Sequence, residues 1–426
     1  MIRHPPRLPR TVHVARPGLL LLLAGGLPLL LTMPQAAAAA AAQGPASAVG
    51  KPTVLTAKNC ASAPAGNAFY VPPDPLPPGR HGDIIWCRPA ASPAPGANAW
   101  QILYLSTTVS GARTAVSGTV LVPTAPSPDT RPVAGYAPGT QGWGDQCAPS
   151  KEMASGNFDE QFAVDNLLAQ GWAVAVTDYP GLGTPGDETY SVGISEGYAV
   201  LDALHAATVL PGAGLATTAP VGIEGYSQGG GAAGWAAQLQ PRYAPGLRLH
   251  GVAMGGTPAN LQAVAANING SAFFAFLGGA ALGFNAAYPS RQLLSELTPA
   301  GRAALGQLGT MCQEQALATY AGKRIQDYTV GGVNPITEPR WQRVLNTNDL
   351  GALKPQVPVL QYHGTADEVI PWRVEAALHR QWCALGVTTL LTSYPGDHVA
   401  AHIEAQPQVI KWLRARLAGT PAAGNC

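Results

Sequence analysis

Short apolar runs alternate with amphipathic stretches of helical length over most of the chain, and this alternation constrains the fold more than any other feature. Strands that are separated by helices require right-handed crossovers, and such crossovers build a mostly parallel sheet. The sequence therefore predicts an α/β fold with its functional site at the carboxyl ends of the strands. Strands are expected at 100–109, 115–122, 133–137, 172–177, 220–224, 357–362 and 387–394, and helices at 159–170, 197–210, 372–385 and 401–417.

The alternation breaks down between residues 259 and 351. This segment holds four of the seven phenylalanines, followed by leucines at helical spacing. We interpret 259–351 as a helical cap inserted into a sheet domain made of 99–258 and 352–426. Residues 43–98 are rich in Pro, Gly and Ala, which predicts an extended N-terminal arm, with regular structure beginning near Trp100.

Residues 1–42 have the pattern of a secretory signal peptide. Four arginines precede an apolar run at 18–33, and an alanine tract at 36–42 offers small-residue cleavage sites. A membrane anchor is the alternative, but the run has about 16 residues and contains Gly and Pro, whereas a spanning helix needs about 20. We expect a secreted or periplasmic protein with no transmembrane segment in the mature chain.

Charged residues make up only 12% of the chain, and 25 basic residues balance 24 acidic ones. This balance does not favour electrostatic capture of a polyanion, so nucleic acid is not an expected partner. The chain has six cysteines after the signal peptide, and an even count in an exported protein predicts disulfide bonds. Their spacing leaves the pairing open and does not fit a zinc site, so no metal is expected. The cysteines are Cys60, Cys87, Cys147, Cys312, Cys383 and Cys426.

Two pentapeptides match the pattern G-x-S-x-G, in which a serine occupies a sharp turn between a strand and a helix. Their serines are Ser227 and Ser195. Ser227 follows the apolar run at 220–224 and precedes three glycines and two alanines, which would let strand, turn and helix pack closely. Ser195 follows a polar stretch, and we interpret it as the N-cap of a helix that begins at Glu196. Ser227 is therefore the predicted nucleophile.

A serine nucleophile needs a histidine base and an acid that orients the base, and on this fold the chain order is serine, acid, histidine. Asp367 follows the strand expected at 357–362, and His398 follows the strand expected at 387–394. Both residues would lie at the carboxyl ends of their strands, so we expect them to converge on Ser227. Glu368 and Asp397 are the alternatives for the acid. The other histidines of this region, His363, His379 and His402, are interpreted as ordinary hydrogen-bonded or surface residues.

Acyl transfer also requires backbone donors for the oxyanion. One is expected to be the N–H of Gln228, which follows the nucleophile, and the other is expected at Thr140 in the glycine-rich loop 137–144. Phe273, Phe274 and Phe276 of the cap are expected to line an acyl-binding cleft, because apolar walls supply most of the binding energy of a lipid. Alternatively, these aromatic side chains only seal the cap onto the core.

Taken together, these motifs resemble the secretory lipase family, the lipase-A-like α/β-hydrolases. The resemblance covers about 100–417 and implies an exported α/β-hydrolase with a helical cap before the strand of the acid. It implies hydrolysis of acylglycerols and simpler carboxylic esters, with Ser227, Asp367 and His398 as the triad and Thr140 and Gln228 as oxyanion donors. The motifs are PGT at 138–140, CAPS at 147–150, DYPGLG at 178–183, GYSQGG at 225–230, HG at 363–364 with Asp367, and GDH at 396–398.

The resemblance also implies a pairing of the cysteines. It pairs Cys147 with Cys312, which would tie the early glycine-rich loop to the cap. It further pairs Cys383 with Cys426 and leaves Cys60 for Cys87.

The function expected from these features is that of a secreted serine hydrolase, a triacylglycerol lipase or carboxylesterase that works through an acyl-enzyme without a cofactor. Its expected partners are acyl esters or lipids, with transient contact to a lipid surface. An acetyl or aromatic esterase acting on polysaccharide and a serine peptidase are alternatives, because fold does not fix substrate. A non-enzymatic binding protein is disfavoured by the intact set of serine, acid and histidine.

Overall fold

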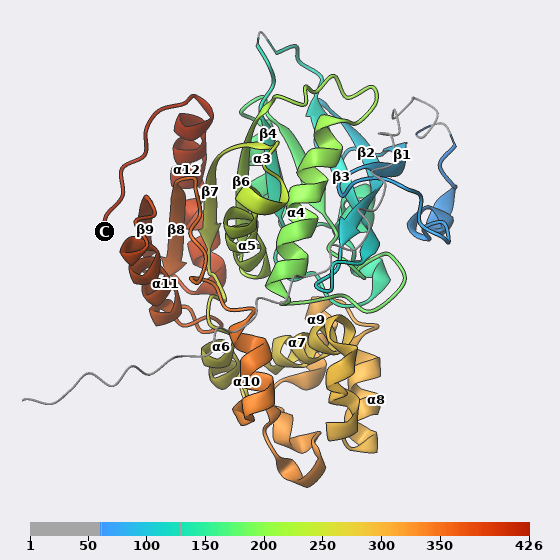
Figure 1. Ribbon diagram of the computed structural model, residues 1–426, viewed down its shortest axis with the longest axis vertical. Coiled ribbons are helices and arrows are strands. Elements are labelled where there is room, and N and C mark those ends of the chain that lie inside the picture. Colours follow the sequence, from blue (N-terminus) through green and yellow to red (C-terminus); the bar gives the residue numbers. More distant parts are fainter. Residues whose placement is uncertain (1–59, 61, 128) are drawn as a thin grey trace, which may run out of the picture. The chain divides into compact units, whose positions relative to one another are not determined.

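The computed structural model describes residues 60, 62–127 and 129–426, and within them the chain forms a nine-stranded sheet (Figure 1). The strand order is β1-β2-β3-β5-β4-β6-β7-β8-β9. Strands β5 to β9 along this order pair in parallel, whereas β1, β2 and β3 form an antiparallel edge that joins β5. The strands are β1 (Ile84–Ala90), β2 (Ala97–Thr107), β3 (Arg113–Pro123), β4 (Val133–Ala137), β5 (Ala173–Thr177), β6 (Pro220–Tyr226), β7 (Arg248–Gly255), β8 (Val359–Gly364) and β9 (Thr389–Tyr394).

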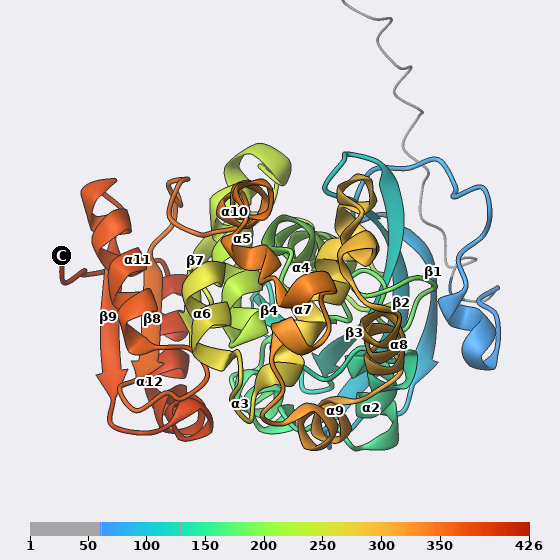
Figure 2. The same ribbon diagram turned by 90° about the horizontal axis from the view of Figure 1, so that it is seen from below.

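Helices cover both faces of the sheet, which explains why the central strands β4 and β5 are largely apolar on both faces rather than alternating. Every residue of β4 and β5 is buried. Residues of α4, α5 and α11 pack on one face, and residues of α2, α3 and α12 pack on the other, as Figure 2 shows from below. These helices are α2 (Pro149–Ser155), α3 (Gln161–Leu168), α4 (Gly193–Thr208), α5 (Gln228–Tyr243), α11 (Trp372–Ala384) and α12 (His398–Leu417).

A helical cap lies between β7 and β8 and has an apolar core of its own. Its helices gather at one end of the sheet layers (Figure 1). The cap contains α6 (Leu261–Ile268), α7 (Phe274–Ala287), α8 (Pro299–Leu308), α9 (Gln313–Tyr320) and α10 (Pro339–Asn346). Short 3-10 turns connect them at η3 (Pro289–Arg291), η4 (Leu293–Glu296), η5 (Ile325–Asp327), η6 (Val330–Gly332) and η7 (Pro335–Thr337). The mostly parallel sheet and the cap before β8, the strand that Asp367 follows, are those predicted from the sequence.

The prediction that regular structure begins near Trp100 is wrong. β1 lies within the segment interpreted as an extended arm, and β2 begins at Ala97. β1 escapes detection because its pairing with β2 is irregular between Ile84 and Trp86, and because Pro89 interrupts the apolar pattern. Proline is tolerated there because β1 is the edge strand. The short turn η1 (Gly66–Tyr70) precedes it and buries two aromatic rings.

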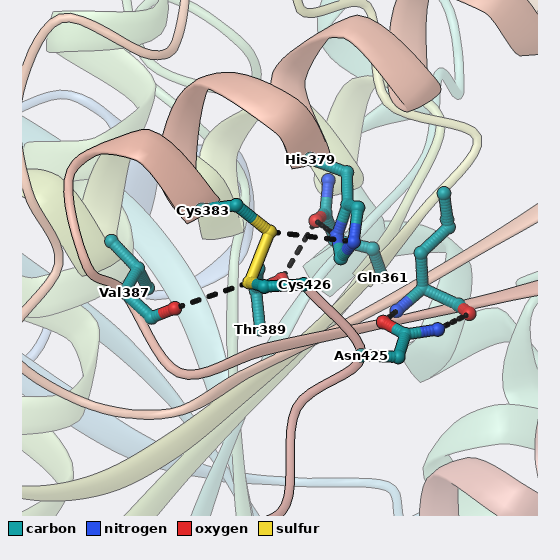
Figure 3. The surroundings of a disulfide bond; sticks show 8 residues. Gln361, His379, Cys383, Val387, Thr389, Asn425 and Cys426 are labelled. Atoms are coloured by element: carbon teal, nitrogen blue, oxygen red, sulfur yellow. Dashed lines mark hydrogen bonds between the residues drawn. A yellow bond between two sulfur atoms is a disulfide. The ribbon is translucent and has the colours of Figure 1, made fainter.

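Three disulfide bonds join the six cysteines and confirm the pairing implied by the family resemblance. Cys60–Cys87 fastens the segment before η1 to β1, and Cys383–Cys426 fastens the C-terminus to α11 (Figure 3). Cys147–Cys312 joins the short turn η2 (Asp145–Cys147) to the start of α9 in the cap.

Within the described residues, no helix combines the length and apolar character needed to cross a membrane. The expected signal peptide at 1–42 lies outside the described residues.

Candidate active site

Ser227 occupies the sharp turn between β6 and α5, as the sequence predicts. Its backbone has φ of 58° and ψ of −122°, a conformation that costs a non-glycine residue free energy and is typical of functional sites. The backbone N–H of Ser227 donates to the carbonyl of Gly255 at the end of β7, at 3.0 Å. Gly225 permits the turn, because a Cβ on it would lie 2.2 Å from the carbonyl oxygen of Gly229. The turn therefore holds the serine hydroxyl at the carboxyl end of the sheet.

His398 and Asp367 converge on Ser227. The Nε2 atom of His398 lies 3.0 Å from Ser227 Oγ, and its Nδ1 atom lies 2.7 Å from Asp367 Oδ2. An ionised carboxylate only accepts hydrogen bonds, so Nδ1 carries the proton and Nε2 is free to accept one from the serine. Asp367 is fixed in turn, since its Oδ1 accepts from the backbone N–H groups of Val369 and Ile370 at 3.0 and 2.7 Å.

The electrostatics of Asp367 keep its carboxylate charged. Burial by itself would raise the pKa of Asp367, but hydrogen bonds from His363 and His398, together with the positive charge that either ring carries when it is protonated, outweigh burial and hold it well below its usual range. An ionised Asp367 is the form that can orient His398 and stabilise its imidazolium.

The alternative acids do not contact the imidazole ring of His398. Asp397 is the N-cap of α12 and accepts from the N–H of Ala400 at 2.8 Å, while Glu368 accepts from the backbone N–H of His398 at 3.2 Å.

The alternative histidines have other surroundings. His402 stacks on Tyr226 with ring centroids 4.4 Å apart, and burial lowers its pKa to about 3. His379 lies beside the Cys383–Cys426 disulfide (Figure 3). His363 is fully buried behind Asp367, with its Nε2 atom 3.1 Å from Asp367 Oδ2.

The second G-x-S-x-G serine is not on a strand-to-helix turn. Ser195 lies in the first turn of α4, is buried, and its Oγ is 2.8 Å from Thr189 Oγ1. The expectation that it is an N-cap is wrong, because α4 begins at Gly193 and Val192 is the cap. The helix begins before Ser195 because the backbone N–H of Glu196 already donates a helical hydrogen bond to the carbonyl of Val192, at 3.1 Å.

The loop that carries Thr140 lies against the start of α5. A Cβ on Gly229 would be 1.8 Å from the carbonyl oxygen of Ala137 and 2.8 Å from that of Pro138. Gln228 is the first residue of α5, and the first N–H groups of a helix have no acceptor within it and favour negative charge. The predicted donors Gln228 and Thr140 therefore stand on two segments in contact beside Ser227.

Buried polar groups that the sequence did not reveal hold these two segments. The Glu160 carboxylate accepts from the N–H of Gly139 at 2.8 Å, and the hydroxyl of Tyr190 is 2.8 Å from Thr140 Oγ1. The side-chain amide of Gln228 donates to Glu188 at 2.8 Å and to Glu196 at 2.9 Å. No local pattern marks these residues, since each acts across a long sequence separation.

The glutamates of this group are protonated more readily than usual. Burial raises the pKa of Glu196 to about 8, and burial also raises that of Glu188 well above its ordinary value. Burial likewise raises the pKa of Glu160 to about 8. These raised pKa values favour the neutral form of the carboxyl groups beside the start of α5, where negative charge would oppose the binding of an anion.

Ser227 opens into a cavity of about 150 Å³ whose walls come mainly from the cap. Phe274 and Phe276 line this cavity together with leucines of α8. Phe273 is not among the residues that line it in the described part of the chain. It precedes the first turn of α7 and stacks beside Phe276, with ring centroids 6.3 Å apart. The apolar walls come mainly from α6, α7, α8 and residues 325–345, which are distant from Ser227 in the sequence.

One group of side chains that could bind a metal occurs in the described residues, namely His379, Cys383 and Cys426. The two sulfur atoms are joined in a disulfide and therefore offer no thiolate. This geometry does not fit a metal site.

A mostly parallel sheet with a serine on the turn after β6, an aspartate after β8 and a histidine after β9 defines the α/β-hydrolase class of serine hydrolases. Residues 152–425 match the family described as secretory lipase, and the chain belongs to that family. It is thus a secreted carboxylic-ester hydrolase of the lipase and esterase type.

Two lipases are similar in sequence to this chain over most of its length. A secreted triacylglycerol lipase of Malassezia globosa is 32% identical over 84% of this chain and 81% of its own length. Lipase 10 of Candida albicans is 32% identical over 85% of this chain and 83% of its own length.

Solved structures share the fold. Candida antarctica lipase A superposes with a TM-score of 0.75 at 24% identity, covering 83% of this chain and 86% of that one. A rice cell wall degrading esterase from Xanthomonas oryzae superposes with a TM-score of 0.65 at 20% identity, covering 80% of this chain and 99% of that one.

Proposed function

We propose that this protein hydrolyses acylglycerols and related fatty-acyl esters through an acyl-enzyme on Ser227. The observation that carries the proposal is the hydrogen-bonded series Ser227, His398 and Asp367 at the mouth of an apolar cavity. The activity named for the Malassezia globosa relative, a triacylglycerol lipase, supports the same substrate class.

In the first half of the reaction, His398 Nε2 accepts the proton of Ser227 as its Oγ attacks the ester carbonyl. Asp367 holds the ring in the tautomer that leaves Nε2 unprotonated and stabilises the imidazolium that forms. The N–H groups of Gln228 and Thr140 receive the oxyanion. The alcohol then leaves with the proton that His398 returns to it.

In the second half, water attacks the acyl-enzyme and His398 accepts its proton. Collapse of the second tetrahedral intermediate returns that proton to Ser227 Oγ and releases the fatty acid. Ser227, His398 and Asp367 are already in hydrogen-bonding contact, so the proton transfers need little reorganisation of these three side chains.

The acyl chain is proposed to occupy the cavity in the cap. Phe274 and Phe276 would contact it, whereas Phe273 would act by packing on Phe276. Apolar surface buried there contributes about 25 cal/mol per Å², or about 0.8 kcal/mol for each methylene group. The apolar walls favour a fatty-acyl ester over an acetyl ester of a sugar, in which the acyl group is too short to use them.

We also propose transient contact with a lipid surface. Val399 and Ile403 lie one turn apart at the start of α12, directly after His398, and are 65% and 55% exposed. Apolar side chains exposed beside the site would favour contact with an aggregated substrate. A turnover of tributyrin that is the same below and above its solubility limit would count against this contact.

The test of the function is a series of p-nitrophenyl esters from acetate to palmitate, hydrolysed by the mature protein and by its Ser227→Ala variant. We expect activity to extend beyond about eight carbons and to fall by at least about a thousandfold in the variant. Activity confined to acetate and butyrate would make the protein a small-ester esterase. Equal rates in the two proteins would remove Ser227 from the mechanism.

A further inference from the structure

Asp367 Oδ2 faces two imidazole rings. The Nδ1 atom of His398 lies 2.7 Å away, and the Nε2 atom of His363 lies 3.1 Å away. His363 is the penultimate residue of β8 and is fully buried. The proposed catalytic acid therefore has a second histidine behind it that the triad does not use.

The surroundings of His363 favour donation by both of its ring nitrogens. Its Nε2 atom faces the carbonyl oxygen of Ile370 at 2.8 Å as well as the Asp367 carboxylate, and its Nδ1 atom faces the Glu375 carboxylate at 3.2 Å. A neutral imidazole has one donor and one acceptor nitrogen, whereas an imidazolium has two donors. With carboxyl and carbonyl oxygens on both sides, the geometry favours a doubly protonated ring.

The charges around the ring agree with this protonation. Burial by itself would lower the pKa of His363, but hydrogen bonds to Asp367 and Glu375 and the negative charges of those residues outweigh burial and raise it to about 10. The charged groups that face the ring are Asp367, four residues further along the chain, and Glu375, from α11. His398, from α12, contacts the same oxygen of Asp367 as His363 does.

Glu375 is fixed by its own donors. The N–H of Thr257 donates to its Oε2 at 3.0 Å, and the Gln361 amide donates to its Oε1 at 2.6 Å. Gln361 Oε1 in turn accepts from His379 and from Thr389, next to the Cys383–Cys426 disulfide (Figure 3). The anion beside His363 thus cannot turn away from the ring without breaking buried hydrogen bonds.

We propose that His363 is a positioning residue, a buried imidazolium held by Glu375 that orients Asp367 and extends the activity of the proposed triad towards low pH. Its positive charge favours the ionised form of Asp367. Without this charge Asp367 would take up a proton at a higher pH, and a protonated Asp367 cannot stabilise the imidazolium that forms during the reaction. The inference rests on the triad role proposed for Ser227, His398 and Asp367.

The test is the pH profile of kcat/KM for His363→Gln. The glutamine amide can donate where His363 Nε2 donates but carries no charge. We expect the acid limb of the profile to move towards higher pH by about one unit, which lowers kcat/KM about tenfold at a pH on that limb, while the plateau stays within about fivefold of the wild type. KM should change little, because His363 does not line the acyl cavity.

His379→Gln is the matched control, since it removes a buried histidine from the outer end of the same series of hydrogen bonds without contact to Asp367. Its acid limb should coincide with that of the wild type. An unshifted limb in His363→Gln, or an equal loss at every pH, would overturn the proposal and leave His363 a structural residue only.

A measurement on the wild-type protein covers the case in which the variant does not fold. Nitrogen NMR of protein labelled with ¹⁵N-histidine should show one ring with both nitrogens protonated up to at least pH 8. A spectrum in which every histidine is a neutral tautomer at pH 8 would overturn the proposal. Failure of Ser227→Ala to lose activity would instead refute the proposed function, so the two outcomes are distinguishable.

Discussion

The contact between α5 and the loop that carries Thr140 makes Gly229 a sensitive position. In Gly229→Ala, the new Cβ would lie 1.8 Å from the carbonyl oxygen of Ala137, whereas Cβ atoms hardly ever approach another heavy atom within 3.0 Å. The loop and the helix must therefore separate by at least 1.2 Å, the difference between these two distances. The separation falls between the two proposed oxyanion donors, Gln228 and Thr140.

The expected loss follows from this displacement. A misplacement of about 1 Å in an active site costs about a hundredfold in rate, and loss of one oxyanion donor costs about 100- to 1,000-fold in kcat. We expect kcat of Gly229→Ala to fall about a hundredfold. KM should change by less than about threefold, because neither Gly229 nor Ala137 lines the acyl cavity. The overpacked contact should also lower the free energy of unfolding by about 1–3 kcal/mol.

Gly231→Ala is the matched control in the same helix. There the new Cβ would meet Cγ of Pro258 at 3.2 Å, a contact that a shift of a few tenths of an ångström relieves. Its kcat should stay within about fivefold of the wild type. The assay is steady-state hydrolysis of p-nitrophenyl butyrate, paired with urea denaturation of each variant. A kcat for Gly229→Ala within threefold of the wild type, in a protein that is fully folded, would refute the role assigned to this contact.

Three further predictions concern the cavity, the buried carboxyl groups and the disulfide bonds. Leu305→Trp fills part of the cavity, so the ratio of palmitate to butyrate hydrolysis should fall at least about tenfold; an unchanged ratio would place the acyl chain elsewhere. Burial raises the pKa of Glu196 from 4.5 to about 8, so the folded state keeps a proton that the unfolded state has lost, and the free energy of unfolding should fall with rising pH across this window. Urea denaturation from pH 5 to 8 should show that the free energy of unfolding falls less steeply with pH in Glu196→Gln than in the wild type. Equal slopes in the two proteins would contradict this. Replacing Cys147 and Cys312 together by serine should lower the free energy of unfolding by about 2–4 kcal/mol, as measured by urea denaturation, and wild-type stability would contradict the tie between loop and cap.

The parts of the structure that the sequence predicts are those with a local signal. The central strands β4, β5 and β6 are buried on both faces, so they read as short, largely apolar runs, with Glu224 of β6 as a buried exception. Ser227 is recognised because one strand, one turn and one helix suffice to define its position. Asp367 and His398 follow from the order of strands along the chain.

The parts that the sequence does not predict depend on contacts made at long range. β1 is an irregular edge strand, and the first three residues of β7 are not buried, so neither shows a continuous apolar pattern. Glu160 and Glu188 look like surface residues in the sequence, but Glu188 is buried and Glu160 is partly buried, with hydrogen bonds to Gln228 and Gly139. Only the folded chain brings these partners together.

Covalent labelling tests the central claim most directly. A fluorophosphonate reacts with an activated serine, and peptide mapping then identifies the residue. The account predicts one adduct, on the peptide that contains Ser227, which disappears in Ser227→Ala and forms at least about a hundredfold more slowly in His398→Ala. An adduct on Ser195, or labelling at an unchanged rate in His398→Ala, would contradict it.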